Sequence, residues 1–140
     1  MEKKMRNHID GVVKTFVLIT MSWILSSCKS SLPVTPGDPI PFPTKVSYSK
    51  DVQRLFDQTC ALAGCHDAAA HAGTLALDSW SDALLSDTGV VIVGDTTNSR
   101  LVWRIEGTHS LKQMPADLPP LNANEIAGLK RWILQGAQNN

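Results

Sequence analysis

The feature that most restricts how this chain can fold is a pair of cysteines with a histidine directly behind the second. The run reads C-A-L-A-G-C-H and occupies residues 60–66. On a regular helix, residues five apart point about 140° away from each other, so Cys60 and Cys65 cannot reach one partner from an unbroken helix. The residues between them must therefore form a loop, and Gly64 tolerates the unusual φ that such a loop needs.

Short helices are expected on both sides of this loop. Residues 49–60 carry apolar side chains at helical spacing, with Ser49 placed as the N-cap. Shorter helices are expected over residues 78–85 and 98–105. The run 89–94 is apolar and β-branched, which predicts a lone strand or an extended loop.

The last helix has the clearest local signal. Asn122 followed by Glu125 resembles a capping box, although Asn stands in place of Ser or Thr. Gly136 lies where a helix end is expected. Several short helices with long loops indicate a small all-α domain. Its apolar side chains are few for so much loop, which suggests that something else fills part of the core.

The N-terminal segment has the pattern of an export signal. Basic residues precede an apolar run from Thr15 to Leu25, which is shorter than the roughly 20 residues that a bilayer span needs. The run leads into L-S-S-C, which resembles the lipobox of bacterial lipoproteins. This resemblance implies cleavage before Cys28 and attachment of lipid to its sulfur. The alternative is an ordinary signal peptide cut nearby, which leaves Cys28 as a free thiol.

These observations predict three segments. Residues 1–27 are a lipoprotein signal peptide, residues 28–44 are the lipidated cysteine with a proline-rich, extended tether, and residues 45–140 are the folded domain. The whole chain has 13 basic and 13 acidic residues, and without residues 1–27 it keeps nine basic and eleven acidic ones. No nucleic-acid partner is expected, because such proteins usually have an excess of basic residues.

The order of motifs along the chain carries a resemblance to a family. The stretch from Tyr48 to Ala137 resembles small monohaem cytochrome c domains of exported bacterial proteins, including the type named after planctomycete cytochromes, in which a C-x4-C-H variant of the C-x-x-C-H motif is familiar. The landmarks are Y-S-K-D-V-Q-R-L-F-D-Q-T-C-A-L-A-G-C-H, A-G-T-L-A-L-D-S, V-G-D-T-T-N-S-R-L, M-P and L-N-A-N-E-I-A-G-L-K-R-W-I-L-Q-G-A.

The resemblance implies an all-α, cytochrome c-like domain wrapped around one covalently bound haem c. It implies thioether links at Cys60 and Cys65, His66 as the proximal iron ligand and Met114 as the distal one. His109 is the alternative distal ligand. The side chains expected to line the haem are Leu75, Leu77, Leu101, Ile105 and Trp132.

With both axial positions filled by protein, such a domain transfers single electrons and is not an enzyme. Its expected partners are redox proteins of the cell envelope, with a lipid anchor in a bacterial membrane and the domain on its periplasmic or cell-surface side. One alternative is a disulfide-stapled surface lipoprotein that binds a ligand or partner without haem. Another is the haem subunit of a periplasmic dehydrogenase. A zinc site from Cys60, Cys65, His66 and His71 is less favoured, because structural zinc normally has two well-separated ligand pairs.

Overall fold

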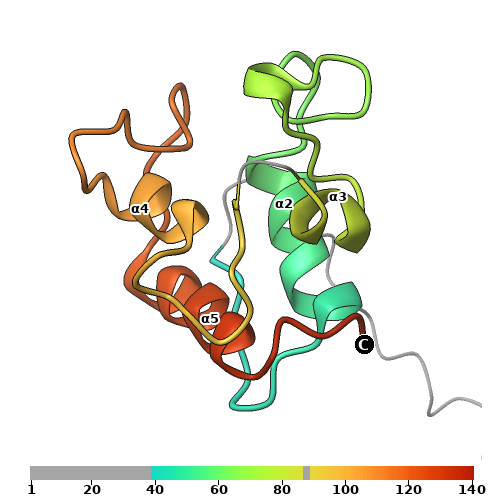
Figure 1. Cartoon of the computed structure of the whole chain (residues 1–140), viewed down its shortest axis with the longest axis vertical. Coiled ribbons are helices and arrows are strands. Elements are labelled where there is room, and N and C mark those ends of the chain that lie inside the picture. Colours follow the sequence, from blue (N-terminus) through green and yellow to red (C-terminus); the bar gives the residue numbers. More distant parts are fainter. Residues whose placement is uncertain (1–38, 87–88) are drawn as a thin grey trace, which may run out of the picture. The chain divides into compact units, whose positions relative to one another are not determined.

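The computed structural model describes residues 39–86 and 89–140. These residues form four α-helices joined by loops, and their only strand-like pairing is a single bridge between Ile92 and Asp95 (Figure 1). The prediction of a small all-α domain is therefore confirmed. No helix in the described ranges is long and apolar enough to cross a membrane. The predicted signal peptide, Cys28 and the tether up to residue 38 lie outside the described residues.

The first predicted helix begins as a π-helical turn, η1 (Tyr48–Val52), and continues as α2 (Gln53–Thr59). Its cap is Ser47, not Ser49 as predicted. The Ser47 hydroxyl accepts a hydrogen bond from the backbone N–H of Lys50 at 3.4 Å. The prediction placed the cap two residues too late because the π-helical turn starts the helix at Tyr48.

Two more helices lie close to the ranges predicted for them, residues 78–85 and 98–105. They are α3 (Trp80–Leu84) and α4 (Arg100–Glu106). The apolar run between them forms no regular strand. Instead, the buried Ser99 hydroxyl accepts from the backbone N–H of Ile92 at 2.8 Å and donates to the Asp95 carbonyl at 2.6 Å. This side chain supplies the partners that a strand would have found in a sheet.

The last helix, α5 (Ala123–Leu134), confirms the capping-box prediction. Asn122 Oδ1 accepts from the backbone N–H of Glu125 at 3.0 Å, and Glu125 Oε2 accepts from the backbone N–H of Asn122 at 2.9 Å. The helix ends just before Gly136, whose φ of 97° is a conformation that glycine adopts at little cost.

One hydrophobic core joins these helices. α5 packs against η1 and α4, and the rings of Tyr48 and Trp132 lie with centroids 5.5 Å apart. The largest fully buried side chains are those of Ile40, Val46, Val52, Leu55, Phe56, Leu77, Ser99, Ile105, Leu129, Trp132 and Ile133. In the described part of the chain, the protein's own side chains therefore pack α2, α4 and α5 into one core.

The segment just before residue 45 packs into this core. The Ile40 side chain is buried, and its backbone N–H donates to Glu125 Oε1 at 3.2 Å. Phe42 lies directly over Gly128 of α5, where an added Cβ would be 2.0 Å from the Phe42 ring. We expected the folded domain to begin at residue 45, and these contacts extend its packing back to Ile40.

Candidate functional site

The segment from Cys60 to His66 is a closed loop at the end of α2. The helix stops at Thr59, the Cys65 N–H donates to the Leu62 carbonyl at 2.9 Å, and the His66 N–H donates to the Cys60 carbonyl at 3.1 Å. Gly64 has a φ of 83°. The expectation that the residues between the cysteines loop out, with Gly64 in a conformation that favours glycine, is confirmed.

The two cysteines have different surroundings. Both are free thiols, with Cys60 partly buried and Cys65 exposed. Burial raises the pKa of Cys60 to about 11, against the smaller opposing effect of a hydrogen bond with Thr59. The Thr59 hydroxyl lies 3.3 Å from the Cys60 sulfur. The disulfide that we weighed as an alternative is not formed in this structure.

The His66 ring is oriented by the backbone. Its Nδ1 lies 3.2 Å from the carbonyl oxygen of Leu75, and its own carbonyl accepts from the Leu77 N–H at 2.8 Å. Because a carbonyl only accepts hydrogen bonds, the proton is on Nδ1 and the lone pair is on Nε2. Histidines that bind metals commonly donate their second nitrogen to a carbonyl in this way.

Met114 lies on a different loop, between α4 and α5. Its side chain is half-buried, and its backbone N–H donates to the Arg104 carbonyl at 2.8 Å. The loop that carries His66 and the loop that carries Met114 project from the same end of the domain (Figure 1). The two residues that we expected to bind one iron therefore belong to two loops that project from the same end of the domain.

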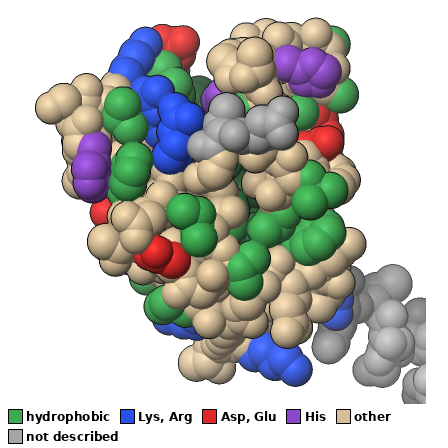
Figure 2. All heavy atoms as spheres, in the orientation of Figure 1, with side chains coloured by type: hydrophobic (Ala, Val, Ile, Leu, Met, Phe, Trp, Pro, Cys, Tyr) green, Lys and Arg blue, Asp and Glu red, His purple; other side chains and the backbone are tan. Residues whose placement is uncertain are grey.

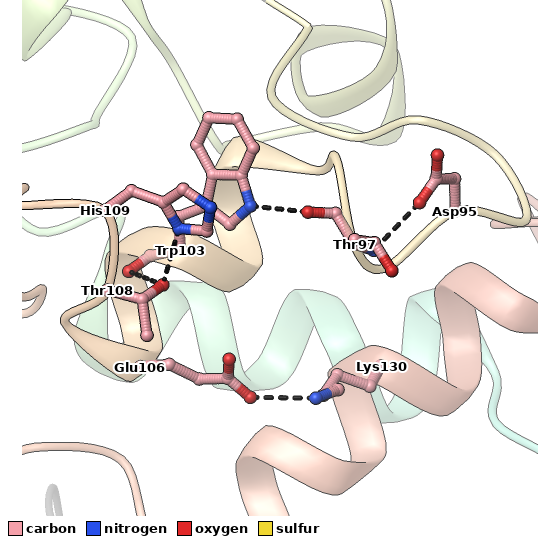
Figure 3. A network of polar contacts seen from close by, with 7 residues as sticks. All are labelled: Asp95, Thr97, Trp103, Glu106, Thr108, His109 and Lys130. Carbon is pink, nitrogen blue, oxygen red and sulfur yellow. Dashed lines mark hydrogen bonds and ion pairs between the residues drawn. The ribbon is translucent and has the colours of Figure 1, made fainter.

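His109, the alternative distal ligand, has another partner. Its ring stacks on the indole of Trp103, with centroids 4.2 Å apart and planes at 22°, and its Nδ1 lies 3.0 Å from the Thr108 hydroxyl (Figure 3). His109 and His71 are both exposed, and Figure 2 shows histidine side chains on the surface at widely separated places. The stacking favours Met114 over His109 as the distal ligand.

The cysteines do not form a zinc site in the part of the chain that the structure describes. Within residues 39–86 and 89–140, no three His, Cys, Asp or Glu side chains are grouped so that they could hold a metal ion. A surface hollow of about 300 Å³ lies beside the η2 turn (Ala72–Thr74) and α3. It is lined by His71, Thr74, Ala76, Ser81, Asp82, Leu85 and Ser86. Because His66 and Met114 do not line it, we do not assign it to the site.

Four of the five side chains that we expected to line a haem belong to the core. Leu77, Leu101, Ile105 and Trp132 are buried in the protein's own packing, and Leu75 is half-buried at its edge. The Leu75 carbonyl was not expected to have a role. A backbone carbonyl leaves no pattern in the side chains from which its role could be predicted. Leu75 makes this contact because the folded loop brings its carbonyl, nine residues after His66, next to the imidazole.

The donor set of the loop fits covalent haem attachment. Thioether formation needs two thiols that are not bridged to each other, and both are present. Iron ligation needs an imidazole with a free lone pair, and the Leu75 carbonyl leaves it on Nε2 of His66. The chemistry of these three side chains thus agrees with the role that the sequence pattern predicts.

Comparison with protein-family models finds a match to part of the chain. Residues 63–117 match the family model of planctomycete cytochrome C. The matched segment is less than half of the chain, includes Cys65, His66 and Met114, and begins after Cys60. No curated protein and no solved structure matches the chain significantly.

Proposed function

We propose that this chain is a c-type cytochrome that carries single electrons in a bacterial cell envelope. The observation that carries this proposal is the His66 imidazole, held through Nδ1 by the Leu75 carbonyl directly behind two unbridged thiols. The match of residues 63–117 to the planctomycete cytochrome C family supports it. Haem c, when bound, supplies an iron that changes its charge by one electron.

In this proposal the chain's own residues hold the haem. Cys60 and Cys65 form the thioether links, His66 is the proximal ligand through Nε2, and Met114 is the distal ligand. A thioether is a soft, neutral ligand, so His/Met ligation raises the reduction potential relative to two histidines. Because protein side chains take both axial positions, we propose electron transfer and no bond chemistry on a substrate.

Electron exchange is proposed to occur at the edge that Cys65 exposes. Ala63, Gly64 and Cys65 are all exposed, and none of them is charged. Small uncharged side chains allow a partner protein to approach closely without desolvating a charge. We propose brief, weak docking of a redox protein there, as is usual for electron-transfer interfaces. A dehydrogenase that delivers its electrons to this domain would use the same edge.

The anchor is proposed from the N-terminal pattern. Cleavage before Cys28 and lipidation of its sulfur would tie the domain to a bacterial membrane through the proline-rich tether. Labelling cells with a radioactive fatty acid tests this step. The full-length chain is expected to take up label and fractionate with membranes, and the Cys28→Ala variant to do neither. Equal labelling of both chains would refute the anchor without affecting the proposal for the haem.

The central test is covalent haem. The full-length chain is produced in a bacterial host with a haem-attachment system, separated on a denaturing gel and stained for haem peroxidase activity. We expect haem to stay with the denatured chain, and to be lost in the Cys60→Ala, Cys65→Ala double variant. A colourless parent chain with a Cys60–Cys65 disulfide in its mass spectrum would refute the proposal and favour the haem-free lipoprotein.

A further inference from the structure

The loop that carries Met114 is folded back onto the last turn of α4. An α-helix leaves its last four carbonyls without partners in the helix. In α4 the Trp103 carbonyl accepts from the Thr108 N–H at 2.9 Å, and the Arg104 carbonyl accepts from the Met114 N–H at 2.8 Å. The Ile105 carbonyl accepts from Gln113 Nε2 at 3.0 Å. The Trp103 carbonyl also accepts from the Gly107 N–H at the end of the helix, so the contacts that the loop adds for otherwise open carbonyls are those to Arg104 and Ile105.

Arg104 holds this loop in two ways. Its carbonyl accepts from Met114, and its guanidinium Nη1 donates to the carbonyl of Lys112 at 3.1 Å. Arg104 is thereby hydrogen-bonded to both neighbours of Gln113, Lys112 and Met114. The side-chain amide of Gln113 donates to the carbonyl of Ile105, the next residue of the helix. We call these contacts of Arg104 and Gln113 the α4 clasp.

The clasp rests on a helix that is itself tied to the core. Ile105 is buried. Glu106 forms an ion pair with Lys130 of α5 at 2.8 Å (Figure 3). Gly107 turns the chain away from the helix with a φ of 66°, and an added Cβ there would lie 3.2 Å from Gln113. The last turn of α4 is therefore tied to the rest of the domain through Ile105 and Glu106, and the exposed Gln113 side chain bonds to this turn through the Ile105 carbonyl.

We infer that Arg104 and Gln113 are positioning residues for the distal ligand. This inference rests on the proposed function and assigns residues that the family resemblance does not name. A neutral thioether competes poorly with harder nitrogen ligands for ferric iron. If the loop is already ordered before Met114 binds iron, ligation costs less conformational entropy. A competing ligand then displaces Met114 less easily. The clasp thereby keeps Met114 as the ligand in the oxidised protein.

Competition with imidazole tests the clasp. Ferric protein with covalent haem is titrated with imidazole, and displacement of Met114 is followed by loss of the sulfur-to-iron charge-transfer band. A typical hydrogen bond is worth about a five- to tenfold change in an equilibrium constant. We therefore expect Arg104→Ala and Gln113→Ala each to bind imidazole about five- to tenfold more tightly than the parent, and the double variant more tightly still.

Three further variants separate positioning from general loss of stability. Arg104→Lys keeps a donor for the Lys112 carbonyl and is expected to restore most of the parent's imidazole affinity. Gln113→Glu has the same shape without the N–H donor and is expected to behave like Gln113→Ala. Arg54→Ala removes a charge from α2, away from the clasp, and is expected to bind imidazole as the parent does.

The outcomes separate this inference from the proposed function. A parent chain without covalent haem on the gel refutes the proposed function before any variant is made. A haem-carrying parent whose spectrum is unchanged by Met114→Ala refutes Met114 as the ligand, and the clasp with it. If Met114 is the ligand, imidazole affinities within about twofold of the parent in Arg104→Ala, Gln113→Ala and Gln113→Glu would refute the clasp alone.

Discussion

The imidazole of His66 is held by the backbone carbonyl of Leu75, 3.2 Å from its Nδ1. Leu75 has extended backbone angles at the end of the η2 turn, and Leu77 closes the same loop through its bond to the His66 carbonyl. A backbone carbonyl can only accept a hydrogen bond, so this contact makes Nδ1 the donor and leaves Nε2 as the nitrogen available to iron.

The first prediction concerns this histidine. The His66→Ala variant is expected to lose the low-spin absorption spectrum of a six-coordinate haem and most of its covalent haem, because the proximal nitrogen is gone. The His71→Ala variant, which alters an exposed histidine of the same loop, is expected to keep both. Absorption spectra and haem-stained gels of the two variants, made side by side, measure this. A low-spin spectrum that survives in His66→Ala would contradict the assignment.

The second prediction concerns the order in which the thiols react in the haem-free chain. The thiolate is the reactive form, and burial raises the pKa of Cys60 to about 11. Exposed Cys65 is therefore expected to be alkylated by iodoacetamide before Cys60 at pH 8, as followed by peptide mass spectrometry. The rate at Cys60 should keep rising up to about pH 11. Faster labelling of Cys60 at pH 8 would contradict its burial.

The same pKa has a consequence for stability. An unfolded cysteine ionises near pH 8.5, whereas folded Cys60 keeps its proton up to about pH 11. The contribution of this thiol to stability is therefore complete below about pH 8.5 and is lost as the pH rises toward 11. Urea unfolding of the haem-free chain is expected to need less urea over this range, and the Cys60→Ser variant to show a smaller decrease.

The helices could be predicted because their signals are local. The capping box at Asn122 and Glu125 and the stop at Gly136 need only neighbouring residues, and α5 begins and ends where they indicate. The packing of Ile40 and Phe42 on α5 could not be predicted, because the prolines around them also fit an extended tether. Only contacts with residues more than 80 positions later distinguish the two readings.

The candidate site also has a part that could be predicted from the sequence and a part that could not. Cys60, Cys65 and His66 lie within seven residues of one another, so their spacing alone predicted the loop that joins them. The backbone acceptor at Leu75 and the clasp at Arg104 and Gln113 were not predicted. They depend on carbonyls, which every residue has, and on where a helix happens to end.

A fourth prediction tests the packing of the segment before residue 45. By helix propensity alone, Gly128→Ala within α5 would stabilise the protein by about 1 kcal/mol. The added Cβ would instead lie 2.0 Å from the Phe42 ring, so we expect a net loss of about 1–3 kcal/mol in the free energy of unfolding. Urea unfolding measures it, with Ala127→Gly as an exposed control in the same helix, expected to lose about 1 kcal/mol.

The double variant Phe42→Ala, Gly128→Ala shows whether the ring is the cause. If it is, the two substitutions are not additive, because removing the ring makes room for the new Cβ. We expect the double variant to be more stable than the sum of the single losses predicts. Additive losses would mean that Phe42 does not lie over Gly128.

The last prediction uses Tyr48, the chain's single tyrosine. Burial, with smaller contributions from Asp57, Asp82 and Asp78, raises the pKa of Tyr48 above its ordinary value of 10.0, and its hydroxyl donates to Gln53. Folded protein thus keeps the proton where unfolded protein loses it, so stability is complete below about pH 10 and falls at higher pH. In the haem-free chain, phenolate absorbance is expected to appear only as the helices unfold in alkali. Phenolate that forms near pH 10 with the circular dichroism of the helices intact would contradict the burial of this ring.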